Sequence, residues 1–252
     1  MDFYFSRFEH RRPPEPLTTP RWVMITWQVL AVAALILGAN YIYWRWTASL
    51  NTDALWYAIP LVLAETLAWI GTVLFTINLW KEQDPPQSPP PGEINECLSP
   101  EEAVEPRPVK VDLFIATYSE DTELVRLSIR DALKMTYPFP IDYRIQVLDD
   151  GRRPEMIAVC EEEGVNYITR QTNIGFKAGN LRNGLEQTDG DFIVICDADT
   201  RVFPTLLSHT LGYFRDPDVA WVQTPQWFFD LPEGENLSRW GQRKAGKVGY
   251  GL

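Results

Sequence analysis

Two long apolar runs near the N-terminus restrict the fold of this 252-residue chain more than any other feature. Residues 22–44 carry no charge, and residues 56–80 contain a single ionisable side chain, Glu65. A helix needs roughly 20 apolar residues to cross a bilayer, and both runs are long enough. Trp22 and Trp44, near the ends of the first run, are typical of the membrane interface. The sequence therefore predicts two transmembrane helices, at about 22–44 and 56–80.

The first run has a second interpretation, as a cleaved signal peptide. A signal peptide has a shorter apolar region and a small-residue cleavage site, and neither is evident, so a retained helix is favoured. Glu65 also has two interpretations. It is either a functional site that faces other helices, or an acid that lies near one interface or is protonated. The second is favoured, because the sequence shows no partner for it.

Basic residues near the two runs predict their orientation. Four arginines precede the first run, one arginine lies in the short connection, and one lysine follows the second run: Arg7, Arg11, Arg12, Arg21, Arg45 and Lys81. The positive-inside rule then places both ends of the helix pair in the cytoplasm. We expect a cytoplasmic segment at 1–21 and a helical hairpin within 22–81 that tethers the rest of the chain.

The chain after the second run has two parts that differ in composition and pattern. Residues 82–109 contain eight prolines and are expected to form an extended spacer, with a ligand for an aromatic groove as the alternative. From residue 110 onward, short apolar runs alternate with helical patterns. Strands are expected at 111–116, 143–148, 165–169, 192–196 and 219–223, and helices at 122–135, 155–163, 177–187 and 204–213. Repeated β-α-β units predict an α/β fold with a mostly parallel sheet.

Charge, cysteine content and missing motifs exclude several function classes. The formal net charge of −11 and the pI near 4.7 argue against a nucleic-acid partner. The three cysteines are widely spaced and form no C-x-x-C pair, so neither a zinc site nor a disulfide framework is expected. The sequence contains no P-loop, no dinucleotide-binding glycine motif and no nucleophile motif.

Polar clusters follow three of the expected strands, at Thr117–Glu120, Asp149–Gly151 and Asp197–Asp199. Open α/β sheets bind ligands at the carboxyl ends of their parallel strands, so we expect these clusters to meet there. The two acids of the third cluster are two residues apart in an extended segment. They therefore point to the same side, where they suit a divalent metal on a phosphate. A fourth cluster, Lys177–Asn180, begins an expected helix and suits an anion.

Each cluster taken alone has a simpler interpretation. Asp-x-Asp and Asp-Asp-Gly sequences are common in turns. An acid of Asp149–Gly151 can accept the imide N–H of a uracil, or only stabilise its own turn. Thr117 suits a helix N-cap better than a contact with a base or ribose. The combination is more specific than any of its parts.

In their order, the four clusters and the run Val222–Phe229 closely resemble the bacterial cellulose synthase catalytic subunits. These are processive family 2 glycosyltransferases. The resemblance covers residues 111–230, and the preceding helix pair fits it. It implies a nucleotide-diphospho-sugar transferase (GT-A) fold, partial here, over 110–252. It also implies UDP-glucose as donor, Mg²⁺ or Mn²⁺ as cofactor, and a growing β-1,4-glucan as acceptor. The implied location is the cell inner membrane, with a periplasmic cellulose synthase subunit as partner.

The resemblance also assigns residues by position. The residues that would hold the donor are Thr117, Tyr118, Glu120, Asp149, Asp150, Lys177, Asp197 and Asp199. Within this set, Lys177 would hold the diphosphate, and Asp197 and Asp199 would hold the metal. The residues that would lie near the acceptor are Thr224, Pro225 and Gln226.

The sequence departs from the family at its reactive end. Gln226 replaces the usual His, so a base role there is not supported. The Thr-Glu-Asp motif, which supplies the general base, and the Gln-x-x-Arg-Trp motif are missing, and Asn236–Trp240 resembles the second only by chance. We therefore expect no catalytic residue in this chain, which would be an N-terminal fragment with the donor half of the site. The alternatives are a family 2 transferase with a different sugar or a lipid acceptor, and a silent nucleotide-binding subunit.

Overall fold

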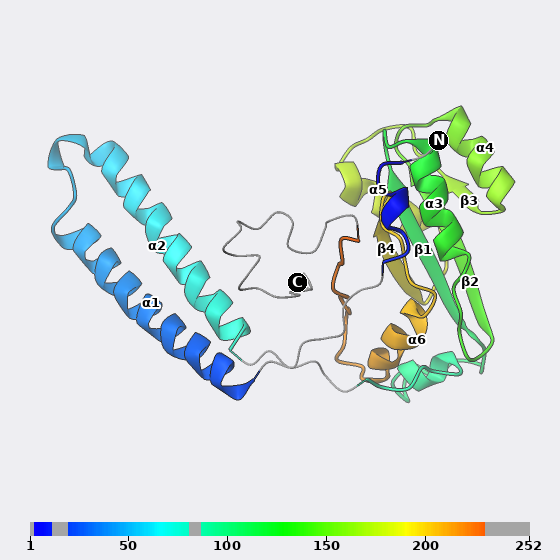
Figure 1. Ribbon diagram of the computed structural model, residues 1–252, viewed down its shortest axis with the longest axis horizontal. Coiled ribbons are helices and arrows are strands. Elements are labelled where there is room, and N and C mark those ends of the chain that lie inside the picture. The colour runs from blue at the N-terminus through cyan, green and yellow to red at the C-terminus, as the bar shows by residue number, and fades with distance from the viewer. Residues whose placement is uncertain (1–2, 12–19, 81–86, 230–252) are drawn as a thin grey trace. The chain divides into compact units, whose positions relative to one another are not determined.

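The computed structural model describes residues 3–11, 20–80 and 87–229 (Figure 1). They form two compact units. A helical unit contains the chain from 8 to 85, and an α/β unit contains the chain from 86 to 225. The stretch Asn236–Trp240, which resembles a family motif by chance, lies outside the described residues. A short 3₁₀ turn, η1 (Ser6–Phe8), lies near the N-terminus.

The helical unit is a pair of packed helices, α1 (Arg21–Thr47) and α2 (Leu55–Asn78), joined through the 3₁₀ turn η2 (Thr52–Ala54). Both helices are long and apolar enough to cross a membrane. No residue of α1 is buried within the described chain, and α2 buries only Val62 and Thr76. Such a large uncovered apolar surface suits contact with lipid.

Several close contacts join α1 to α2, and two of them bear on the sequence. Gly38 lies against the indole of Trp69, where an added Cβ would come within 2.6 Å of the ring. Arg45, expected in the connection, instead lies inside α1. Its Nε donates to Oε2 of Glu65 at 2.6 Å, and its Nη2 donates to Oε1 at 3.3 Å. The expectation that Glu65 has no partner was therefore wrong, because the two residues are 20 positions apart and meet only when the hairpin forms.

The α/β unit contains a parallel sheet of four strands in the order β3-β2-β1-β4 (Figure 1). The strands are β1 (Val109–Thr117), β2 (Ile141–Asp149), β3 (Asn166–Ile168) and β4 (Phe192–Asp197). The neighbours of β1 are parallel to it on both sides, with Ile115 opposite Val147 and Cys196. The expected α/β class is confirmed.

Helices cover both faces of this sheet. On one face, α3 (Thr122–Ala132) and α4 (Pro154–Glu163) enclose the buried side chains of Leu113, Ile115 and Val147. On the other, α5 (Phe176–Gln187) covers Phe114 and Leu148. Gly184 of α5 permits this approach, since a Cβ there would lie 2.9 Å from the side chain of Leu148. At the amino end of β1, α6 (Leu206–Thr210) and η4 (Leu211–Arg215) bury Leu207 and Leu211.

Three expectations differ from the structure. Residues 219–223, expected to be a strand, have no regular structure. The single helix expected at 204–213 is divided into α6 and η4. The described part of the expected spacer, residues 87–109, packs onto the α/β unit: η3 (Ile94–Cys97) buries Ile94, and Arg215 donates to the carbonyl of Pro89 at 2.8 Å. Prolines fix an extended backbone but leave carbonyl groups that can accept hydrogen bonds.

Candidate functional site

The polar clusters meet at the carboxyl edge of the sheet, as the parallel arrangement requires. Thr117 at the end of β1 lies opposite Asp149 of β2, and Ala116 lies opposite Asp197 of β4. Because β1 is central, the ends of β2 and β4 flank it on either side. Lys177 joins them from the start of α5, where its ammonium pairs with the carboxylate of Asp197.

Asp149 is fully buried, and its carboxylate is occupied by the protein itself. It accepts hydrogen bonds from the backbone N–H groups of Gly151 (2.9 Å) and Arg153 (2.8 Å), from Nε of Arg153 (3.2 Å) and from the hydroxyl of Tyr167 (3.1 Å). Gly151 is required in this turn, because a Cβ there would lie 2.2 Å from the carbonyl oxygen of Tyr118. These contacts make Asp149 the organiser of the turn after β2.

Glu120 folds back over the end of β1. Its Oε2 accepts from the Thr117 hydroxyl (2.8 Å), the Tyr118 N–H (2.7 Å) and the Ser119 N–H (3.1 Å). Partial desolvation raises the pKa of Glu120, but these hydrogen bonds outweigh it and hold the pKa below its ordinary value. The carboxylate is thus ionised at neutral pH, while the Tyr118 side chain stays 58% exposed and free to face a ligand.

Asp197 and Asp199 have the features expected of a metal-binding pair. Asp197 ends β4 and Asp199 lies in the turn that follows, and both acids are exposed, while Cys196 and Ala198 are buried. Asp199 makes no hydrogen bond or ion pair with the described residues. No group of three or more His, Cys, Asp and Glu side chains in the described ranges is placed to hold a metal. Two carboxylates suffice where phosphate and water supply the other ligands, so the pair fits a Mg²⁺-type ion.

Asn180 belongs to the Lys177–Asn180 cluster, but the sequence assigned it no role of its own. It is 2% exposed near the start of α5, and its Nδ2 donates to the carbonyl of Leu148 at 2.8 Å. Its Oδ1 is buried without a hydrogen-bond donor from the described chain. A buried acceptor without a partner is unusual and marks a position that a ligand or water can satisfy.

The sequence also missed two arginines that organise the edge, Arg153 and Arg170. Arg153 donates from Nη2 to the Thr117 hydroxyl at 2.8 Å, and Arg170 pairs with Asp150. Arg153 follows Asp149 by 4 positions and Arg170 follows Asp150 by 20 positions. Neither arginine belongs to a recognisable motif. The only signal available was that buried acids require cationic partners.

The expected acceptor residues are divided between the two compact units. Thr224 and Pro225 are exposed in an irregular segment at the end of the α/β unit. Gln226 is exposed and belongs to the other compact unit. Their roles remain predictions.

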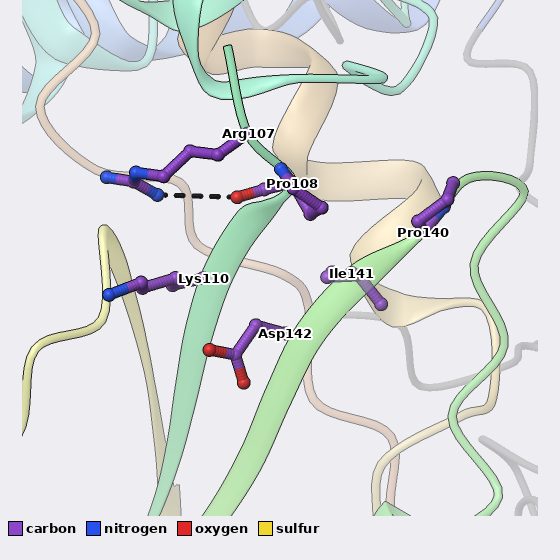
Figure 2. Close-up of a pocket in the computed structure, with 6 residues that line it drawn as sticks. All are labelled: Arg107, Pro108, Lys110, Pro140, Ile141 and Asp142. Atoms are coloured by element: carbon purple, nitrogen blue, oxygen red, sulfur yellow. Dashed lines mark hydrogen bonds between the residues drawn. The ribbon is translucent and has the colours of Figure 1, made fainter. Parts of the chain in front are cut away.

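A separate hollow lies at the opposite, amino-terminal end of β1 and β2, lined by Arg107, Pro108, Lys110, Pro140, Ile141 and Asp142 (Figure 2). Figure 2 shows Arg107 donating to the carbonyl of Pro108, at 3.3 Å. Its two cations are already paired, Arg107 with Asp191 and Lys110 with Asp189. The hollow is therefore not a second anion site.

Open parallel sheets of α/β proteins bind their ligands at the carboxyl edge, which in this chain carries acids and a lysine. The model of glycosyl transferase family 2 matches residues 112–249. The chain belongs to this family, and the fold is of the glycosyltransferase α/β type that the sequence predicted.

Curated relatives are similar over most of this chain. It is 33% identical over 238 residues to a cellulose synthase catalytic subunit (UDP-forming) of Pseudomonas fluorescens (strain SBW25), covering 88% of this chain and 29% of that protein. It is 36% identical over 233 residues to cellulose synthase 1 of Komagataeibacter xylinus, covering 88% and 14%. The chain thus spans less than a third of the length of either relative. Among solved structures, a mannosyltransferase from Pyrobaculum calidifontis in complex with GDP-Man and Mn²⁺ aligns with a TM-score of 0.44 at 18% identity, covering 58% of this chain and 41% of that one.

Proposed function

We propose that this chain carries the donor- and metal-binding half of a membrane-anchored glycosyltransferase. The enzyme would transfer glucose from UDP-glucose, with inversion, to a growing β-1,4-glucan, that is, cellulose. One observation carries the proposal: the clusters at the ends of β1, β2 and β4 and at the start of α5 meet at one edge of the sheet. Family membership and the names of the relatives support the choice of reaction.

The nucleoside would lie over the ends of β1 and β2. Tyr118 is exposed and offers a ring face for stacking on a base. Thr117 and Glu120 hold the backbone beneath it. Asp149 and Asp150 shape the neighbouring turn. Either acid would contact the uridine only through carboxylate lone pairs that its present hydrogen bonds do not use.

The diphosphate would lie between the start of α5 and the end of β4. The Lys177 ammonium is a cation within reach of this position, and backbone N–H groups of the first turn of α5 favour an anion. Asp197 and Asp199 would hold Mg²⁺ or Mn²⁺, which when bound neutralises charge on the leaving diphosphate. The present Lys177–Asp197 pair would then separate, with the lysine moving to phosphate and the carboxylate to the metal.

The helical unit suits an anchor in the inner membrane. Under the positive-inside rule, the α/β unit would be cytoplasmic, where UDP-sugars are available. The glucan and a periplasmic cellulose synthase subunit would then be partners across the membrane.

Calorimetric titration of the detergent-solubilised chain with UDP and Mg²⁺ tests the proposal. We expect UDP to bind, and the double variant D197N/D199N to lose the Mg²⁺-dependent part of the affinity. Asp218→Asn is a matched control, because Asp218 is an exposed acid away from the strand ends. Absence of UDP binding would contradict a donor site and favour a silent subunit. Preference for UDP-N-acetylglucosamine over UDP-glucose would keep the site and change the sugar.

A further inference from the structure

The loop between β3 and α5, residues 169–175, is held by an unusual density of arginine contacts. Among the described residues, only Arg152 (φ 54°) and Phe176 (φ 49°) are non-glycine residues with positive φ. Both lie at the borders of this loop or in contact with it. Positive φ is costly for such residues and persists only where surrounding contacts enforce it.

Arg170 makes four hydrogen bonds at the centre of the loop. Its Nε and Nη2 donate to the two carboxylate oxygens of Asp150 at 2.6 and 2.7 Å. Its Nη1 donates to the carbonyl of Ile174 at 2.6 Å, and its Nη2 donates to the carbonyl of Phe176 at 2.8 Å. The Arg170 and Asp150 side chains are only 11% and 8% exposed. One planar group therefore ties the turn after β2 to the residue that precedes Lys177.

The start of α5 is fitted tightly against this arginine. A Cβ at Gly179 would lie 2.1 Å from the carbonyl oxygen of Ile174 and 2.4 Å from Nη1 of Arg170. Gly175, the N-cap of α5, has φ 77° and a conformation that glycine adopts readily. The position of Lys177 in the first turn is thus set by the loop and by Arg170 beneath it.

Further contacts hold the other side of the loop to the turn after β2. The Nδ2 of Asn173 donates to the backbone carbonyl of Asp150 at 3.2 Å. Nη1 of Arg152 donates to Oδ1 of Asn173 at 2.8 Å and to the carbonyl of Arg170 at 3.2 Å. Displacement of the loop would therefore disturb both the turn after β2 and the start of α5.

We propose that Arg170 is a positioning residue that couples the nucleoside side of the donor site, at Asp150, to its diphosphate side, at Lys177. This role rests on the proposed function. Four of the five N–H donors of the guanidinium are bound to protein, so Arg170 acts through these residues and not by contact with the donor. Lysine cannot replace it, because an ammonium cannot engage a carboxylate in two parallel bonds and also reach two carbonyls.

Double-mutant titrations of the full chain test this role. UDP with Mg²⁺ would be titrated into the wild type, R170A, R170K, K177A and R170A/K177A. We expect R170A to weaken UDP binding about 10- to 100-fold, the size typical of residues that orient a ligating group. R170K should recover little of this loss. Arg182→Ala is the control, because Arg182 is an 82% exposed arginine of α5 whose partner is Glu186.

The coupling between the R170A and K177A substitutions separates a positioning role of Arg170 from a merely structural one. If Arg170 acts through Lys177, its substitution in the K177A background should cost clearly less than in the wild type. Fold losses that simply multiply would overturn the proposal. So would an R170K variant that binds UDP as tightly as the wild type, which decides the case even if R170A does not fold. A wild type that binds no UDP overturns the proposed function and this role with it, whereas unaltered binding in the variants overturns this role alone.

Discussion

The two adjacent acids after β2 differ in their partners, and the difference decides what each can do. Asp149 uses both carboxylate oxygens on backbone N–H groups, Arg153 and Tyr167. Within the described part of the chain, the carboxylate of Asp150 has one partner side chain, Arg170, which binds both of its oxygens. Asp149 is thus committed to the local turn, while Asp150 connects that turn to the next loop.

Substitution of Asp149 by alanine is expected to lower the free energy of unfolding of the α/β unit by about 3–5 kcal/mol, because it leaves the largely buried side chain of Arg153 without its charged partner. The loss should appear as a lower midpoint of urea unfolding, followed by circular dichroism. Asp218→Ala, at an exposed position, should leave the midpoint unchanged. An Asp149→Ala variant as stable as the control would show that its hydrogen bonds are not needed for the turn.

The site residues visible in the sequence are those with a positional signal. Asp197 ends the apolar strand β4 and Asp199 lies in the turn after it, so both acids were found by their position, although the extended backbone expected between them ends at Asp197. Arg153 and Arg170 had no such signal, because their partners are 4 and 20 positions away and only the folded turns bring them together.

At the scale of elements, the β-α-β part of the chain followed its local patterns. Four strands and three helices formed at or near the ranges expected for them. Residues 204–213 did not form the single helix expected, and residues 219–223 did not form a strand. Their apolar patterns are short, so packing against neighbouring elements determines their structure. The prediction for the proline-rich segment failed for a different reason. Composition predicts that its backbone is extended, but it does not predict that the segment packs onto the α/β unit.

The contact between α1 and α2 predicts a coupled pair of substitutions. Glu65→Gln leaves Arg45 without its charged partner, so the helical unit should unfold at lower temperature in detergent micelles. The exchange R45E/E65R should recover part of this loss, since the opposite charges still meet. Glu65→Gln alone with an unchanged transition would show that the ion pair contributes nothing. The melting of the α/β unit, recorded on the same samples, serves as the internal control.

The segment 87–109 should be released from the α/β unit by acid. Burial raises the pKa of Asp191, but Nη1 and Nη2 of Arg107 (both 2.6 Å) and the Lys110 N–H (2.8 Å) lower it more, so the pKa lies below its ordinary value. A lowered pKa contributes stability that is present above the unfolded value of about 3.9 and is lost as pH falls towards the folded value.

Urea unfolding midpoints measured from pH 6 down to pH 3 check this expectation. The wild type should lose stability below about pH 4, where the unfolded carboxyl takes up its proton. Asp191→Asn should start less stable and show a shallower decline over the same range. Parallel curves for the two proteins would mean that Asp191 does not cause the acid sensitivity.

For the whole molecule, the sequence predicted the two classes of unit but not the partners within them. Apolar length alone identified α1 and α2, and alternation alone identified the parallel sheet. Family membership followed from the order of short clusters, which is a property of the chain and not of any single residue. The residue roles depend on side-chain geometry at the sheet edge, which no linear pattern contains.

The 252-residue chain is expected to bind UDP with Mg²⁺ and to make no glucan from UDP-glucose. Under the proposed function its donor edge would hold a nucleotide, but the sequence contains neither Thr-Glu-Asp nor Gln-x-x-Arg-Trp. By resemblance, the Thr-Glu-Asp motif supplies the base that removes the proton from the acceptor hydroxyl, and the Gln-x-x-Arg-Trp motif holds the diphosphate and acceptor. Incubation with radiolabelled UDP-glucose, followed by cellulase digestion of the insoluble product, measures polymer directly. Calorimetric UDP binding in the same preparation is the control for a folded site. Labelled, cellulase-sensitive polymer would mean that a residue within this chain removes that proton, and the exposed acids at the carboxyl edge of the sheet would be the first to substitute.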